Sequence, residues 1–217
     1  MRPTPVLISL AVTATLLLGA CASGPRVTRV AGSTTSPSPS SEPTASPSES
    51  PVSIEPPVPV ESSPPGDIPD DTQFVPYHSK KDGWTVTVPE GWSRTRTGTT
   101  VTFTDKLNTV VVSWQPAAAA PTVASAKAGE VPQLLQSTRA FTLVSVTSGS
   151  LPADPFVLVR YRANSDPNPV TGKQYRLDVL RYELFKNGEE RVITLLSPVG
   201  ADNVDPWNAV TQSFKWS

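Results

Sequence analysis

A long stretch near the start of this chain cannot build a hydrophobic core. In residues 21–72, Pro, Ser and Thr dominate and bulky apolar side chains are scarce. Little apolar surface is therefore available to offset the entropy that a chain loses when it becomes ordered. Proline also removes backbone donors and favours extended conformations. We expect a disordered, fairly stiff linker here, which leaves residues 73–217 as one folded domain.

The residues before this linker have the layout of an export signal. Arg2 provides a positive start, and residues 6–18 form an apolar run, shorter than the roughly 20 residues that span a bilayer. The run leads into Leu18-Gly19-Ala20-Cys21, which resembles the lipobox of bacterial lipoproteins. This resemblance implies a lipoprotein signal peptide in residues 1–20, cleavage before Cys21, and attachment of a diacylglycerol to the Cys21 sulfur.

Lipidation of Cys21 would hold the protein on the extracytoplasmic face of the cell membrane. A diacylglyceryl cysteine carries at least two acyl chains, such as palmitate, and two chains anchor far more firmly than one. Two alternatives remain open: an ordinary signal peptide cut near Ala20 or Ala22, and an uncleaved N-terminal anchor. Burial of this lone cysteine in a core is implausible beside Ser- and Pro-rich sequence, and one cysteine cannot form an internal disulfide.

Charge changes at the boundary between linker and domain. Residues 22–72 contain two Arg and seven acidic residues, whereas residues 73–217 contain fifteen Lys or Arg and twelve acidic residues. The small positive excess of the second part forms no dense basic run. Nucleic-acid binding depends on such a concentration of positive charge. We therefore expect no nucleic-acid partner.

The sequence after residue 73 is typical of a sheet. Alternating or continuous runs of β-branched, aromatic and other apolar residues predict seven strands, over residues 84–88, 100–104, 109–114, 141–146, 156–162, 174–185 and 192–196. The dipeptide Asn187-Gly188 predicts a tight hairpin, because both residues tolerate positive φ. Short connections predict antiparallel pairing. In the run 174–185 the apolar phase slips after Val179, which indicates either a bulge or a strand covered on both faces.

Two helices accompany the strands. The Ala-rich segment 121–137 predicts one helix, with Thr122 as N-cap and with Pro132 kinking or splitting it. A second helix follows from Asp205 as N-cap and Pro206 at the first helical position, with Trp207, Val210, Thr211 and Phe214 recurring at helical spacing. Two helices and a meander of hairpins predict an antiparallel α+β sandwich.

Three segments of this domain resemble PsbP-type domains. Residues 82–92 are similar to their opening strand, which ends in Pro-x-Gly-Trp; residues 102–105 resemble their next strand, and residues 205–214 their closing helix. The resemblance covers most of residues 77–217 and implies a Mog1/PsbP-like α/β/α sandwich with a central antiparallel sheet. Exported lipoproteins with this fold include the LpqN-like group of actinobacteria, so the resemblance implies an actinobacterial-type lipoprotein. Most members are non-catalytic accessory or binding proteins.

The sequence offers few groups for catalysis or metal binding. Zinc sites draw mainly on His and Cys, and this chain has one of each. His78 is the one available base for a Ser-His-Asp hydrolase, but no Gly-x-Ser-x-Gly elbow is present. The acids of residues 202–205 are too sparse for a calcium loop, and Glu189-Glu190 reads as a solvated turn. We expect no catalytic residue, no metal and no cofactor.

Aromatic residues and one loop are the remaining candidates for binding. The five tryptophans could line a ligand cleft, but four of them lie at core-like positions, with Trp216 as the expected exception. The proline-stiffened loop 166–173 is a candidate partner-facing surface, and a plain connector is the alternative.

We therefore predict a membrane-anchored envelope lipoprotein that is not an enzyme. Its role would be to bind, or act as an accessory to, a protein, a wall polymer or a lipid. Two alternatives remain: an envelope hydrolase or transferase whose site assembles only in three dimensions, and a lipid carrier with an elongated apolar cavity.

Overall fold

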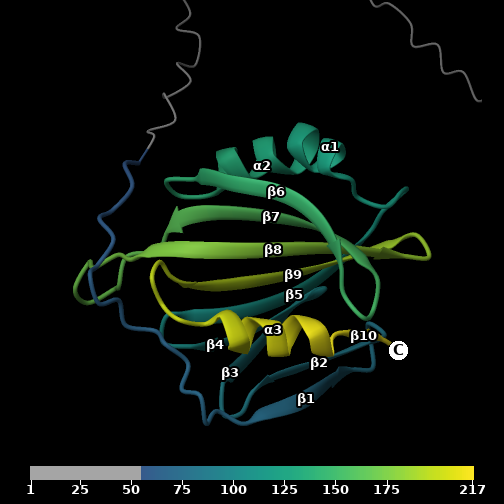
Figure 1. The fold of residues 1–217 in the computed structure, drawn as a ribbon, viewed down its shortest axis with the longest axis horizontal. Helices are drawn as coiled ribbons and strands as arrows, with labels where there is room; N and C mark the ends of the chain where they lie inside the picture. The colour runs from purple at the N-terminus through teal and green to yellow at the C-terminus, as the bar shows by residue number, and fades with distance from the viewer. Residues whose placement is uncertain (1–54) are drawn as a thin grey trace, which may run out of the picture. The chain divides into compact units, whose positions relative to one another are not determined.

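The computed structural model describes residues 55–217 and consists mainly of antiparallel sheet (Figure 1). Cys21, the predicted export signal and most of the predicted linker lie outside the described residues. Seven strands form the larger sheet in the order β3-β4-β5-β9-β8-β7-β6. They are β3 Ser93–Thr97, β4 Thr100–Asp105, β5 Asn108–Pro116, β6 Thr142–Ser150, β7 Pro155–Asn164, β8 Arg176–Lys186 and β9 Glu189–Pro198.

A smaller sheet has the order β1-β2-β10, with β2 in the middle. It is built from β1 (Phe74–Ser79), β2 (Trp84–Pro89) and β10 (Lys215–Trp216). Every strand pair in both sheets is antiparallel, as the short connections predict. The sequence did not indicate β1, β3 or β10.

The first helical segment is interrupted, as its proline predicts. Thr122 caps α1 (Val123–Ser125) in a reciprocal capping box with Ser125. A π-helical turn η1 (Ala126–Glu130) follows, and α2 (Val131–Ser137) then has Pro132 in its first turn. A proline lacks the N–H that a continuous helix needs at this point, so the change of helix type occurs just before it.

The last helix, α3 (Val204–Ser213), begins earlier than the sequence predicts. Its N-cap position is held by Asn203, and Asp205 lies in the first turn. The prediction of Asp205 as N-cap is therefore wrong. The side chain of Asn203 accepts from the backbone N–H of Ile68 and donates to Gly66 instead of capping the helix.

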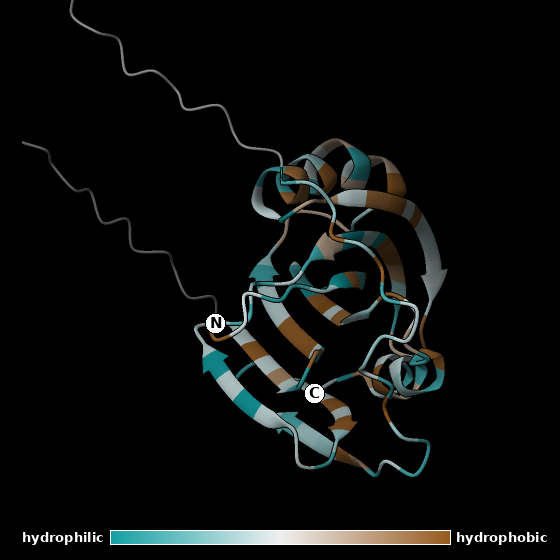
Figure 2. Ribbon diagram, turned by 90° about the vertical axis from the view of Figure 1, so that its left-hand side faces the viewer, coloured by the Kyte–Doolittle hydropathy of each residue, from teal (hydrophilic) through white to brown (hydrophobic). Residues whose placement is uncertain are grey.

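Two hydrophobic cores lie on opposite faces of the larger sheet. One core is formed by β2, α3 and the face of β4, β5 and β9 that is turned toward them. The other core is formed by η1, α2 and the opposite face of the sheet, at β7 and β8. Alternate bands of hydrophobic and hydrophilic residues along the strands reflect this arrangement (Figure 2). Helices on both faces give the α/β/α sandwich with a central antiparallel sheet that the sequence predicts.

The two cores explain the phase slip in β8. Leu177 and Val179 belong to the core below η1 and α2, whereas Leu180, Tyr182 and Leu184 pack with the other core. The register of β8 against both neighbours is continuous, so the strand is covered on both faces and has no bulge. The sheet's irregularity lies in β6, between Leu143 and Ser145. Asn187 and Gly188 form the expected tight turn at positive φ.

Residues 55–72, which the sequence assigns to the linker, contact the domain and contain no helix or strand. Ile68 is buried in the core of β2 and α3, and the carbonyl of Gly66 accepts from the side-chain amide of Asn108. Near the other end, one carboxylate oxygen of Glu55 accepts three hydrogen bonds, from Arg139, Asn164 and Gln174. In residues 55–217, no helix is long and apolar enough to span a membrane.

Acid should loosen the Glu55 end of this segment. The three donors, with Arg139 foremost, lower the pKa of Glu55 from 4.5 to about 2. Stability from this lowered pKa is fully present above pH 4.5 and is lost as the pH falls toward 2. We expect the Val58 amide, which donates to Asn164, to lose protection in that window when followed by NMR. Glu55→Gln should weaken its protection at neutral pH, whereas Glu61→Gln, which breaks an ion pair with Lys173, should not.

Candidate binding groove

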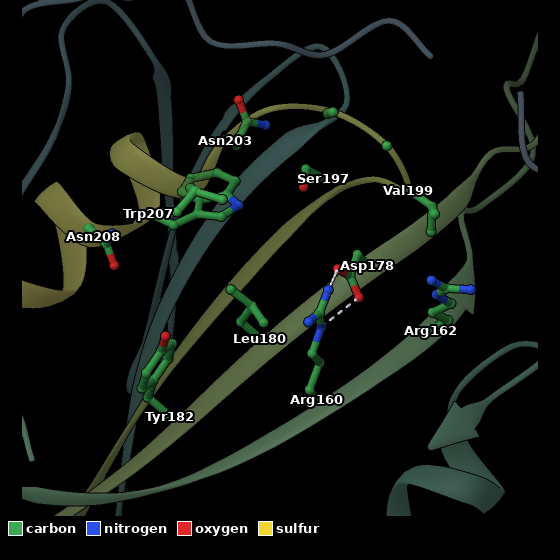
Figure 3. Close-up of a pocket in the computed structure, with 13 residues that line it drawn as sticks. Arg160, Arg162, Asp178, Leu180, Tyr182, Ser197, Val199, Asn203, Trp207 and Asn208 are labelled. Carbon is green, nitrogen blue, oxygen red and sulfur yellow. Dashed lines mark hydrogen bonds and ion pairs between the residues drawn. The ribbon is translucent and has the colours of Figure 1, made fainter. Parts of the chain in front are cut away.

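A groove of about 530 Å³ lies between the start of α3 and the strands β7 and β8 (Figure 3). Its volume is within the range of small-molecule sites. Strand alternation brings the even-numbered residues of β7 and β8 to this face, and α3 supplies residues one turn apart. The groove is lined by Arg160, Arg162, Asp178, Leu180, Tyr182, Ser197, Val199, Gly200, Ala201, Asn203, Val204, Trp207 and Asn208.

One ion pair crosses the strands on the floor of the groove. Arg160 Nε lies 3.3 Å from Asp178 Oδ1, and Arg160 Nη2 lies 2.5 Å from Asp178 Oδ2. This two-point pairing raises the pKa of Arg160 and neutralises the one acidic residue that lines the groove. Asp178 is therefore not placed as a free general base.

Arg162 lines the same groove without such a partner. It is the residue paired with Asp178 across the two strands, but Asp178 bonds to Arg160 instead. No ion pair of Arg162 is formed with any residue of the 55–217 region, and its Nε is buried without a hydrogen bond. The lining side chains of the groove thus carry one net positive charge.

Arg176 does not line the groove but lies on β8 two residues before Asp178, on the same alternate positions. It is only 6% exposed and donates to the carbonyl of Ala140, to Asn164 and to the hydroxyl of Thr142, all uncharged acceptors. Burial lowers the pKa of Arg176, and the nearby charge of Arg162 lowers it further.

The remaining wall of the groove is largely apolar. Leu180 and Tyr182 rise from β8, and Trp207 faces them from α3 (Figure 3). The indole of Trp207 is held edge-on by Trp92, with ring centroids 6.3 Å apart. Burial raises the pKa of Tyr182, and Arg160 opposes the shift. The groove therefore combines a cationic end with aromatic and aliphatic surface.

A second charged cluster lies on the opposite face of β8. Glu183 is 3% exposed, and its Oε1 lies 3.6 Å from Arg181 Nε without a hydrogen bond. Arg181 forms its shorter ion pair, 2.8 Å, with Glu130 of η1. Burial foremost raises the pKa of Glu183 from 4.5 to about 7; Glu130 and Glu190 add to the rise and Arg181 opposes it.

Within residues 55–217, the one histidine bonds to a threonine and forms no hydrogen bond with an acid or with a serine. His78 Nδ1 lies 3.0 Å from the hydroxyl of Thr85, in an exposed position. Its sequence neighbour Ser79 instead donates to Asp82, which also accepts from Arg96 and from the indole of Trp114. A serine and an aspartate thus meet without the imidazole between them.

The tryptophans divide differently from the sequence prediction. Trp84 and Trp207 are buried in the core, and Trp92 and Trp216 pack against it. Trp216 also stacks on Arg191 and donates to Asp154, so the prediction that Trp216 would be the exception is wrong. The exception is Trp114, which is half-buried outside both cores.

Loop 166–173 is exposed, as is its Val170, and a role in partner binding stays a prediction.

The sequence analysis missed the charged residues of the groove, although a signal was present. In β7, Val157, Val159 and Tyr161 face one core, and Arg160 and Arg162 fall on the alternate positions. Two arginines on one face of an inner strand are unusual, because unpaired charge is costly to bury.

Glu189 and Glu190 do not form a paired-acid site, since Glu189 accepts from Arg191 and Glu190 accepts from Gln115. The described part of the chain has no cluster of three His, Cys, Asp or Glu suited to a metal.

Comparison with solved structures finds similar folds at low sequence identity. A cyanobacterial PsbP from Synechocystis sp. PCC 6803 is 16% identical, with a TM-score of 0.48, and the match covers 67% of this chain and 94% of that one. The Ran-binding protein Mog1p of Saccharomyces cerevisiae is 9% identical, with a TM-score of 0.46, covering 67% and 96%.

A protein of unknown function from Pseudomonas aeruginosa is 13% identical, with a TM-score of 0.43, and the match covers 65% of this chain and 95% of that one. No known family profile matches this chain, and no curated protein matches it either. These likenesses concern the fold, so the function has to be argued from the groove itself.

Proposed function

We propose that this protein is a lipid-anchored envelope protein with a non-catalytic binding role, and that the groove beside α3 is its binding site. The observation that carries this proposal is that the acidic residue of the groove is paired, whereas one of its two arginines is not. The one acidic residue, Asp178, is neutralised by Arg160, while Arg162 and the partly exposed side chains of Leu180 and Tyr182 remain available to contact a ligand. The alternatives of an envelope hydrolase and a lipid carrier fit less well.

A hydrolase needs a nucleophile and a base within hydrogen-bond reach. The imidazole of this chain bonds to Thr85 in the smaller sheet, and Asp178 is held by its arginine. A lipid carrier needs an elongated apolar cavity, whereas three charged residues line this groove. Binding without chemistry is the function that uses the groove as it stands.

Attachment to the membrane rests on the sequence around Cys21. An actinobacterial-type lipoprotein would present its domain on the extracytoplasmic side, at the end of the Pro-rich linker. Intact mass of the protein purified from its native membranes should correspond to a chain that begins at Cys21 and carries acyl groups. The Cys21→Ala variant should be absent from the membrane fraction while the domain keeps its thermal unfolding midpoint, because the contacts that stabilise the domain are formed among residues 55–217. Retention of Met1 without acyl groups would contradict the anchor.

The groove can be tested separately in the native envelope. A photo-crosslinking residue at Asn208, on the rim of the groove, should capture the bound molecule. The matched control is Gln212, which is exposed on the same helix but does not line the groove. Mass spectrometry should find an adduct with the Asn208 probe that the Gln212 probe does not give. Identical adducts from the two positions would argue against the groove as the binding site.

A further inference from the structure

The charge of the groove is unbalanced in a way that folding alone does not require. Arg162 and Arg176 both sit on the groove side of the sheet, close enough for one to lower the pKa of the other. Neither forms an ion pair with an acid in residues 55–217. The nearest acidic group to Arg176 through hydrogen bonds is Glu55, reached by way of Asn164 and already bonded to Arg139.

Arg162 has donors that an anion can use. The residue lines the groove and is partly exposed, and its guanidinium forms no ion pair in residues 55–217. Its Nε is buried from solvent, so the donors within reach of a ligand are those of the terminal nitrogens. A guanidinium presents a planar fork that matches a carboxylate or a phosphate in hydrogen bonding. An anion at this end would accept from these terminal nitrogens and relieve the repulsion between Arg162 and Arg176.

The apolar part of the groove selects what is attached to the anion. Leu180 and Tyr182 follow Asp178 along β8 and offer aliphatic and aromatic surface, and Trp207 faces them from α3 (Figure 3). An inorganic anion would leave this apolar surface in contact with water, whereas an apolar body would remove it from water. The groove therefore suits a molecule that is charged at one end and apolar along its body.

We propose that the groove binds an amphiphile with a carboxylate or phosphate head, held by Arg162, and an apolar body against Leu180 and Tyr182, beside the edge of Trp207. This inference rests on the function proposed above and names the class of ligand. The head can belong to a soluble compound or to a membrane lipid, which present the same chemistry. Asp178 does not repel the head, because Arg160 neutralises it.

The test uses the full chain with Cys21→Ala and three soluble probes in calorimetry. We expect n-octyl phosphate to bind, inorganic phosphate to bind much more weakly, and the neutral n-octyl glucoside to bind much more weakly as well. Arg162→Gln should weaken octyl phosphate roughly tenfold or more, as loss of a charge-assisted hydrogen bond does. Arg162→Lys should keep part of the affinity, because the charge remains.

Arg94→Gln is the matched control. Arg94 lies on β3, at the other edge of the same sheet, where its guanidinium stacks 5.1 Å from the ring of Tyr77. Its removal should leave octyl phosphate binding unchanged. Unfolding midpoints of the Arg162 variants within a few degrees of the parent would show that a loss of affinity is not a loss of fold.

Vesicles distinguish the two sources of the head. Arg162-dependent binding to phosphatidylglycerol vesicles, but not to phosphatidylcholine vesicles, assigns the head to a lipid; binding of octyl phosphate without vesicle binding assigns it to a soluble ligand. Equal binding of octyl phosphate and octyl glucoside, or octyl phosphate binding that is indifferent to Arg162→Gln, overturns this inference and leaves groove binding intact. Binding of no amphiphile also overturns it, while the Asn208 crosslink still decides whether the groove is used.

Discussion

Replacing Trp84 with alanine is expected to lower the free energy of unfolding by about 3–5 kcal/mol. Trp84 is 0% exposed, and it is the largest fully buried side chain. Its indole contacts Tyr77 at a centroid distance of 5.4 Å and stacks on Phe214 at 6.5 Å. Its loss would open a cavity where β2, α3 and the larger sheet meet. Urea unfolding followed by far-ultraviolet circular dichroism would measure the change.

Leu135→Ala is the control for this prediction. Leu135 lies on α2 and is 62% exposed, so little apolar burial is lost when it is shortened. Its effect should stay within about 0.5 kcal/mol of the parent protein. A Trp84 variant as stable as the Leu135 variant would show that the core between β2, α3 and the larger sheet does not depend on the Trp84 side chain.

Replacing Glu183 with glutamine is expected to remove a large pH dependence of stability. The pKa of Glu183 is about 7 in the folded protein, against 4.5 as its ordinary value. Between these pH values the folded state holds a proton that the unfolded state has released, so stability falls as the pH rises from about 4.5 to about 7. Below this window the carboxyl is protonated in both states, and above it ionised in both. The total loss is about 3 kcal/mol at most.

Glu183→Gln should therefore be more stable than the parent at pH 8 and should lose most of the advantage at pH 5. The physical reason is that the amide cannot ionise in a site from which water is excluded. Urea midpoints at pH 5, 7 and 8 measure the slope. Glu90→Gln, an exposed carboxylate in the turn after β2, is the control and should leave the slope unchanged. A parallel pH profile for Glu183→Gln and the parent would refute the buried charge as its cause.

The sequence predicted those elements whose own residues carry the signal. Strands β2 and β4 alternate apolar and polar residues, and their apolar faces meet the core as expected; in β5, Val110 and Val112 do so, but Trp114 does not. β3 could not be found this way, since its five residues are Ser, Arg and Thr and all are exposed. It is a strand because β4 pairs with it. β10 is two residues long, and its pairing with β2 depends on α3 bringing it there.

The groove shows a different limit. The sequence shows Arg160 and Arg162 at alternate positions of a strand, but it does not indicate that Asp178 forms its ion pair with Arg160 and not with Arg162. The choice depends on the register of β7 against β8 and on side-chain geometry across the ladder. Asp205 failed as a cap for a similar reason: Asn203 takes that position because its amide is held by Gly66 and Asn108, which are distant in sequence.

If the protein is anchored through Cys21, as proposed above, the bonds of Glu55 have a mechanical consequence. Any tension that reaches this residue from the preceding chain is passed to Asn164, the last residue of β7, and to Gln174, just ahead of β8. These two strands carry the arginines and the aspartate of the groove. A load on the tether and a molecule in the groove would therefore act on the same pair of strands.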